Sequence, residues 1–360
     1  MRKSCFVLFF FYTFIYGQRA EEGYFDLMLF RGSVMNHAPD INHLITGHPR
    51  GLVFSYNFKT TGTKEWQQAY NYPDYGVSFL YQDFENEFLG KVFSLNAHYN
   101  FFFFKRRLML RISQGVAMTT NPYDKELNFK NNAFGTRFMS SNYFLLQYQK
   151  ERWLGPVGIQ TGLFFTHFSN GRIKSPNRGI NTFGVNVGLN YALGETPDRV
   201  LVDTLPKVSE PLKYNLVLRT GLNQSSVVGS KQYPFYHFGV YIDKKISRKS
   251  ALQFGGEFFI TESLKEHVNY LSVAYPEKQV VPNTDYKRVS LFVGHELFIN
   301  NLSIETQVGT YVYKPFKLDA DVYQRLGLKY YISSKLFTGV ALKSHGAKAE
   351  AIEWALGVRL

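Results

Sequence analysis

Residues 156–193 decide the fold. They read PVGIQTGLFFTHF (156–168), SNGRIKSPNRGI (169–180) and NTFGVNVGLNYAL (181–193). The first and last thirteen residues alternate apolar with small or polar side chains. Such alternation is typical of β-strands, because successive side chains of a strand point to opposite faces. The stretch therefore predicts two neighbouring strands that present one apolar and one polar face, joined by a basic loop.

Segments of the same kind recur along the rest of the chain. The candidates are 23–31, 50–59, 74–83, 89–104, 106–118, 137–149, 156–168, 181–193, 213–222, 234–245, 250–262, 286–299, 301–314, 321–332, 335–345 and 350–360. Alternating segments of about ten residues in even number are the pattern of outer-membrane barrels, with one face toward lipid and the other toward a polar lumen. The predicted fold class is all-β, a transmembrane antiparallel outer-membrane β-barrel of about 14–16 strands. A soluble secreted β-protein is the competing interpretation, because a β-sandwich also alternates.

The composition favours the membrane barrel. Phe, Tyr and Trp make up 17% of the 360 residues, and barrels place aromatic girdles at both membrane interfaces. Beyond the N-terminus no apolar run approaches the roughly 20 residues that a spanning helix needs. The formal net charge is +13. Nucleic acid is a common partner of basic chains, but an exported protein is better matched to the phosphates of outer-membrane lipids.

The first twenty residues resemble a secretory signal. Arg2 and Lys3 precede an apolar stretch over residues 5–16, and Gly17 and Ala20 offer small residues for cleavage. We expect residues 1–20 to be removed after export and the mature protein to lie in a bacterial outer membrane. Cys5 is the one cysteine, so the mature chain would contain no disulfide and no cysteine-based metal site.

Connection lengths bear on the number of domains. Links that follow odd-numbered strands are mostly long and those that follow even-numbered strands mostly short, as expected for external loops and periplasmic turns. Residues 60–73 and 194–212 break this rule. The second segment contains three prolines among charged residues and reads as a periplasmic linker, which would be compatible with an N-terminal and a C-terminal barrel. We predict a single barrel over 21–360, because neither half carries its own export signal.

Three polar residues interrupt the apolar face of residues 156–193. His167 and Ser169 are two apart and therefore lie on the same side, and Asn181 begins the same side of the next strand. A serine hydroxyl becomes a nucleophile when a base accepts its proton, and neutral histidine does this near pH 7. A third group must orient the imidazole. The pattern predicts a catalytic set of Ser169, His167 and Asn181 at the lipid-facing external edge, with interfacial polar residues as the alternative.

The loop between the two strands supplies candidate binding groups. The side chain of Asn170 and backbone N–H groups around Gly171 are candidates for stabilising an oxyanion. Arg172, Lys174 and Arg178 form a cluster without any acid, which suits an anionic phosphate headgroup.

These residues resemble a known family. His167-Phe-Ser-Asn170 followed by Pro176-Asn-Arg-Gly-Ile180 is similar to the signature of the PagL-type lipid A 3-O-deacylases, and the run from Leu326 to Leu360 resembles longer acyloxyacyl hydrolases of Bacteroidetes-type bacteria. The resemblance implies an outer-membrane barrel that hydrolyses an ester-linked acyl chain of lipid A. It implies Ser169 as nucleophile, His167 as base and Asn170 as oxyanion residue. The family has a glutamate where this chain has Asn181.

The resulting hypothesis is a serine carboxylic-ester hydrolase that removes an acyl chain from lipopolysaccharide. Because an amide cannot stabilise imidazolium by charge, the alternative is a non-catalytic porin, transporter or structural barrel with a degenerate site. We expect lipid A and outer-membrane lipids as partners, no nucleic acid and no cofactor, and a second copy of the chain is a candidate partner. His37, His43 and His48 lie in one predicted external loop. Metal binding is one interpretation of this cluster, and a solvated loop is the favoured one.

Overall fold

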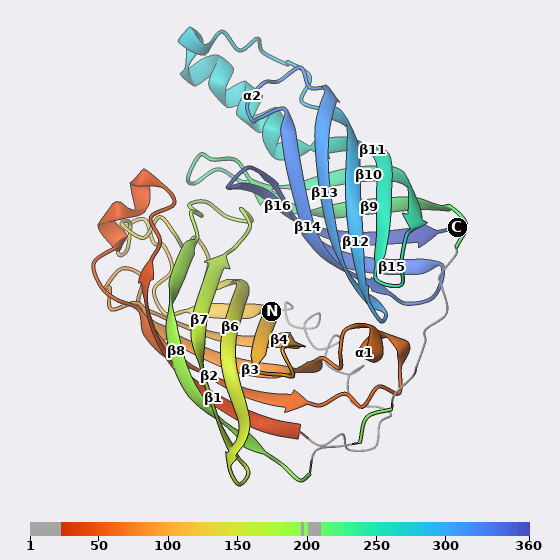
Figure 1. Cartoon of the computed structure of the whole chain (residues 1–360). Coiled ribbons are helices and arrows are strands. Elements are labelled where there is room, and N and C mark those ends of the chain that lie inside the picture. The colour runs from red at the N-terminus through yellow and green to blue at the C-terminus, as the bar shows by residue number, and fades with distance from the viewer. Residues whose placement is uncertain (1–22, 196–197, 201–209) are drawn as a thin grey trace, which may run out of the picture.

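The strands of this protein close into two separate barrels (Figure 1). The computed structural model of the chain describes residues 23–195, 198–200 and 210–360. The predicted signal peptide at 1–20 lies outside the described residues, as does part of the predicted linker at 194–212. Sixteen described strands, all paired antiparallel in sequence order, confirm an all-β antiparallel barrel fold.

The first barrel contains eight strands joined as a continuous meander. They are β1 (Gly23–Val34), β2 (Arg50–Phe58), β3 (Asp74–Asp83), β4 (Lys91–Phe103), β5 (Leu108–Thr119), β6 (Phe138–Leu154), β7 (Val157–Ser169) and β8 (Ile180–Ala192). The barrel closes because β8 pairs with β1, in a register that runs from Tyr24 opposite Ala192 to Val34 opposite Thr182. Two short helical segments, η2 (Pro39–Leu44) and α1 (Glu65–Ala69), lie in its connections.

The second barrel repeats this plan. Its strands are β9 (Lys213–Gln224), β10 (Gln232–Lys245), β11 (Ser250–Thr261), β12 (Arg288–Ile299), β13 (Leu302–Tyr313), β14 (Val322–Tyr331), β15 (Leu336–His345) and β16 (Lys348–Arg359). The pairing of β16 with β9 closes it. Helix α2 (Glu262–Ala274) and η3 (Pro276–Lys278) occupy its longest connection. Of the described helices, none has the length and apolar character needed to cross a membrane.

The single barrel predicted over 21–360 is therefore wrong. The pairing of β8 with β1 uses the strand edge that a single barrel would have offered to β9. A closed barrel leaves no unpaired edge, and in hydrocarbon every backbone polar group must be paired within the protein. The long segment at 194–212 that broke the pattern of short turns is the connection between the two closed units.

Both barrels present apolar side chains outward. Along β8 the outward residues Val185 and Val187 are 61% and 62% exposed, and along β9 Leu216 is 51% exposed. A row of exposed aliphatic and aromatic side chains along successive strands is unfavourable in water and favourable against lipid. The alternation predicted from the sequence thus places an apolar face outside each barrel.

The lumen of the first barrel contains a buried polar network. Arg111 donates to Asp26 at 2.7 Å, and neither side chain is exposed. The same guanidinium donates to Asn100 Oδ1 at 2.7 Å. Buried charges are stable when paired and hydrogen-bonded, so these residues fill the interior without leaving an uncompensated ion.

The lumen of the second barrel is more highly charged. Arg325 lies between Glu257 and Glu353, at 2.9 and 2.6 Å, and Arg219 donates to Glu257 at 2.8 Å. Glu305 also accepts from Arg219, at 3.0 Å. The interior of an eight-stranded barrel is just wide enough for its own side chains. These ion pairs therefore occupy the space that a channel would need.

The two barrels stand side by side in the same orientation (Figure 1). We call the end with connections 35–49, 120–137, 170–179 and 262–287 the loop end, and the opposite end the turn end. At the loop end Ser175 N–H donates to Gln224 Oε1 at 2.6 Å. At the turn end Tyr70 donates to the carbonyl of Phe298 at 2.7 Å, and Arg248 pairs with Glu65.

The filled lumens predict that the protein does not conduct. Purified protein in liposomes should give no swelling with small sugars, because the Arg325 and Arg111 networks block both interiors. A general porin reconstituted at equal density serves as the positive control. Swelling at a rate comparable to the porin would contradict the closed-lumen interpretation.

Candidate functional site

The three predicted catalytic residues meet on the outer face of the first barrel. β7 ends at Ser169 and β8 begins at Ile180, and the antiparallel register places His167 directly opposite Asn181. Because side chains two apart along a strand share a face, Ser169 projects from the same side as His167. The site therefore lies at the loop end of the lipid-facing wall, as the sequence predicted.

A continuous hydrogen-bond chain connects these side chains. His167 Nδ1 lies 2.6 Å from Asn181 Oδ1, and His167 Nε2 lies 3.0 Å from Ser169 Oγ. An amide oxygen only accepts hydrogen bonds, so Nδ1 carries the proton and Nε2 presents its lone pair to the serine hydroxyl. This is the tautomer in which a histidine acts as base toward a nucleophile.

The site lies at the boundary between a covered and an exposed surface. Ser169 is 7% exposed, and His167 and Asn181 are partly buried. Two residues after Asn181, on the same outer face of β8, the side chain of Phe183 is 48% exposed. The hydroxyl therefore sits where an apolar wall meets the folded loops above it.

Gly179 and Asn177, two residues of the motif for which the sequence suggested no role, maintain this geometry. Gly179 has a φ of +66°, and a Cβ there would lie 3.1 Å from Ser169 Cβ and 3.0 Å from the Phe168 carbonyl oxygen. Glycine adopts this left-handed conformation without steric cost. Asn177 accepts a hydrogen bond from the N–H of Asn170 at 2.9 Å. The Asn-x-Gly spacing was the available signal for both residues.

The loop after Ser169 is organised around Asn170. Its Oδ1 accepts from the N–H of Arg172 and its Nδ2 donates to the carbonyl of Lys174, both at 2.9 Å. Nδ2 carries a second hydrogen that this bond does not use. Gly171, with a φ of +59°, packs directly on Ile352 of the second barrel.

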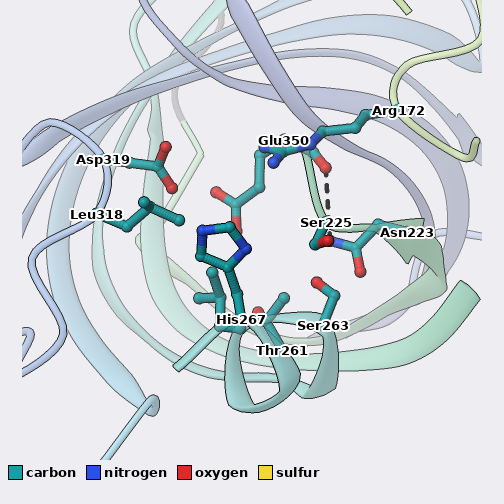
Figure 2. Close-up of a pocket in the computed structure, with 10 residues that line it drawn as sticks. Arg172, Asn223, Ser225, Thr261, Ser263, His267, Leu318, Asp319 and Glu350 are labelled. Atoms are coloured by element: carbon teal, nitrogen blue, oxygen red, sulfur yellow. Dashed lines mark hydrogen bonds between the residues drawn. The ribbon is translucent and has the colours of Figure 1, made fainter. Parts of the chain in front are cut away.

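The structure does not gather the three basic residues of this loop. Arg178 pairs with Asp40 of the first connection at 2.5 Å, and Lys174 is exposed. Figure 2 shows the Arg172 side chain extending toward Glu350, at a small cavity of about 10 Å³ in the mouth of the second barrel. His267, from helix α2, lines the same cavity.

Burial has the largest effect on the pKa of Arg172. It lowers the pKa of the guanidinium, and the carboxylates of Asp319 and Glu350 oppose this effect. Arg172 lines this cavity, and its carbonyl accepts a hydrogen bond from the N–H of Gln224, so it takes part in the contact between the barrels.

A polar patch that was not predicted from the sequence adjoins His167 and Ser169. Gln114, Ser140 and Asn142 share the outer face of β5 and β6, and both Gln114 and Asn142 donate to Ser140 Oγ, at 2.9 and 3.3 Å. Asn142 pairs in register with His167, and Ser140 with Ser169. This adjacency depends on the register between β6 and β7, so no local sequence motif predicts it.

The histidines of the first connection are used separately. The imidazole of His37 donates to the carbonyl of Arg178 at 3.1 Å, and that of His43 to the carbonyl of Lys130 at 2.7 Å. His48 contacts Ser33 Oγ at 3.1 Å. Within the ranges that the structure describes, no group of three metal-binding side chains is assembled.

Comparison with known proteins divides the chain in the same way as the structure. The family model described as lipid A 3-O-deacylase (PagL) matches residues 50–190, and that described as acyloxyacyl hydrolase, C-terminal domain, matches residues 212–360. No curated protein matches the chain. The first range lies within the first barrel and includes the site, and the second spans the second barrel.

Solved structures with some similarity include outer-membrane porins. A triple mutant of Rhodopseudomonas blastica porin is 11% identical over 94% of this chain and 97% of its own, with a TM-score of 0.20. A chain described as "Asymmetric conductivity of engineered proteins" is 10% identical over 94% of this chain and 98% of its own, also with a TM-score of 0.20. Scores this low carry no argument about this chain.

The family models cover both barrels, and His167 and Ser169, which belong to the stretch that resembles the PagL signature, meet on the outer wall. The chain belongs to the PagL-type family of lipid A 3-O-deacylases and acyloxyacyl hydrolases.

Proposed function

We propose that this protein is a serine esterase of the bacterial outer membrane that removes an ester-linked acyl chain from lipid A. The observation that carries the proposal is the hydrogen-bond chain from Ser169 through His167 to Asn181 on an outward, apolar wall. A nucleophile in this position lies beside the apolar wall along which an ester dissolved in the membrane would approach.

The reaction follows from the assigned tautomer. His167 Nε2 accepts the hydroxyl proton while Ser169 Oγ attacks the ester carbonyl carbon. The tetrahedral intermediate collapses, the carbon–oxygen bond to the sugar breaks, and His167 returns the proton to the departing sugar oxygen. Water, deprotonated by the same imidazole, then attacks the acyl-serine and releases the fatty acid.

The oxyanion of the intermediate needs hydrogen-bond donors. We assign this role to the N–H of Gly171 and to the second Nδ2 hydrogen of Asn170. Both residues directly follow the nucleophile, and the Asn170 amide is already held at both of its ends by the loop. Donors fixed before the reaction stabilise the developing charge without reorganisation.

Recognition of the lipid would use the surfaces on either side of Ser169. The exposed Lys174 suits a phosphate of the headgroup, and Arg178, which is also exposed, would exchange its ion pair with Asp40 for another. The patch of Gln114, Ser140 and Asn142 presents amide and hydroxyl groups beside the catalytic residues, where polar side chains are costly unless they bind something. It suits the hydroxyl and amide groups that surround an ester on a sugar.

The nucleophile assignment predicts complete loss of activity on Ser169→Ala. Lipid A mass in cells that overexpress the variant should match that of cells without the protein, whereas wild type should reduce it by one acyl chain. Thr161→Ala, which removes a hydroxyl from the outer face of the same strand but outside the site, serves as the matched control and should retain most activity. A deacylating Ser169→Ala variant would contradict the proposal.

The role of Asn181 predicts that Asn181→Glu raises kcat by about tenfold or more, because a carboxylate stabilises the imidazolium that forms on His167. Asn181→Leu should lower kcat by about 100-fold, since the imidazole loses its orienting partner. Initial rates on lipid A in detergent micelles measure both effects. Equal rates for the wild type and both variants would show that Asn181 does not act on His167.

The polar patch predicts a substrate-dependent effect of Asn142→Leu. The KM for lipid A should rise by about three- to tenfold, the equivalent of one lost hydrogen bond. The rate on p-nitrophenyl butyrate, which lacks a sugar, should change by less than about twofold. Thr161→Leu, further down the outer face of β7, is the control for the apolar substitution. Parallel losses on both esters would argue against a sugar-binding role.

A further inference from the structure

The loop that follows the nucleophile is held by two different barrels. Its second half belongs to the first barrel, where the N–H groups of Arg178 and Gly179 each donate at 3.2 Å to backbone carbonyls of the connection 120–137. Its first half, residues 171–175, faces the second barrel. The donors assigned to the oxyanion lie at the start of that half.

Hydrogen bonds with the second barrel reach three of the five residues of this half. The N–H of Gln224 donates to the Arg172 carbonyl at 3.2 Å, and Gln224 Oε1 accepts from the Ser175 N–H at 2.6 Å. Ser175 Oγ donates to the Ser225 carbonyl at 2.9 Å. Gln232 Nε2 donates to the Ile173 carbonyl at 2.8 Å.

Packing adds to these bonds. A Cβ on Gly171 would lie 2.2 Å from Ile352 Cγ1, so the backbone there lies directly against β16. Arg172 inserts into the cavity at the mouth of the second barrel, and Gln224, Ser225 and Ser175 are all buried. A contact made of buried, satisfied polar groups fixes geometry, because breaking one bond leaves a buried partner unpaired.

We propose that the second barrel is a built-in positioning element for the active site, and that Gln224 is a positioning residue of the esterase. This inference rests on the proposed function. Gln224 touches neither the substrate nor Ser169. Its backbone N–H binds the Arg172 carbonyl, and its side-chain Oε1 binds the Ser175 N–H. Together these bonds fix the path of the backbone that carries the Gly171 N–H. A small displacement of such a donor is enough to lower kcat substantially.

Gln224→Ala tests the proposal in the full-length protein. We expect kcat on lipid A micelles to fall by about 10- to 100-fold with KM changed less than about twofold, because the donor acts on the intermediate. Trypsin should cleave after Arg172 or Lys174 at least about tenfold faster, because loss of the bond between Gln224 Oε1 and the Ser175 N–H lets this part of the loop open more often.

The matched control is Gln324→Ala. Gln324 is in the same barrel and also accepts a backbone N–H, from Gly346 at 2.9 Å, but that bond does not involve the loop at 170–179. Heat-modifiable electrophoretic mobility reports whether each barrel is folded. If Gln224→Ala fails to fold, Ser175→Ala removes the bond to Ser225 from the loop side without altering a strand.

The outcomes distinguish the positioning role of Gln224 from the proposed esterase function. Gln224→Ala with the kcat and cleavage rate of Gln324→Ala overturns the positioning role, as does faster cleavage with unchanged kcat. A fall in kcat without faster cleavage also overturns it. A wild-type protein that does not deacylate lipid A overturns the proposed function instead, and the cleavage rates still report the contact between the barrels.

Discussion

Backbone hydrogen bonding in hydrocarbon is the constraint from which this architecture follows. A strand edge exposed to lipid would leave N–H and C=O groups unpaired, each at a cost of several kcal/mol. The pairing of β8 with β1 and of β16 with β9 removes both edges and leaves two small barrels instead of one wide one. Small barrels have no room for a channel, so the chemistry must lie on the outside or at the rim.

The outer wall gives the proposed catalytic residues an unusual environment. His167 and Asn181 face each other across the β7–β8 ladder, so their 2.6 Å contact is set by strand register rather than by a flexible loop. Ser169 completes the chain at the last residue of β7. Sites built on strands hold their geometry better than sites on loops, and here only the donors that follow the serine depend on a loop.

Strand periodicity was sufficient to place most of the fold and the core of the site. The alternation in 156–168 and 181–193 predicted that His167, Ser169 and Asn181 share one face, and their hydrogen bonds show that they meet there. Periodicity carries no information about which strands pair over long distances. The closure of β8 on β1 and the adjacency of Asn142 to His167 therefore could not be read from it. The same holds for the separation of Arg172 from Arg178, because charge alone does not say where a long side chain will find a partner.

The outward direction of Ser169 also determines how any reactant must arrive. A molecule that reaches this hydroxyl from the surrounding lipid moves in two dimensions, so the rate depends on its density per unit area of leaflet and not on its concentration in solution. The neighbouring apolar side chains, Phe183 among them, keep the approach within the bilayer. Crowding or rigidity of the leaflet would then control turnover as directly as the chemistry of the catalytic residues does.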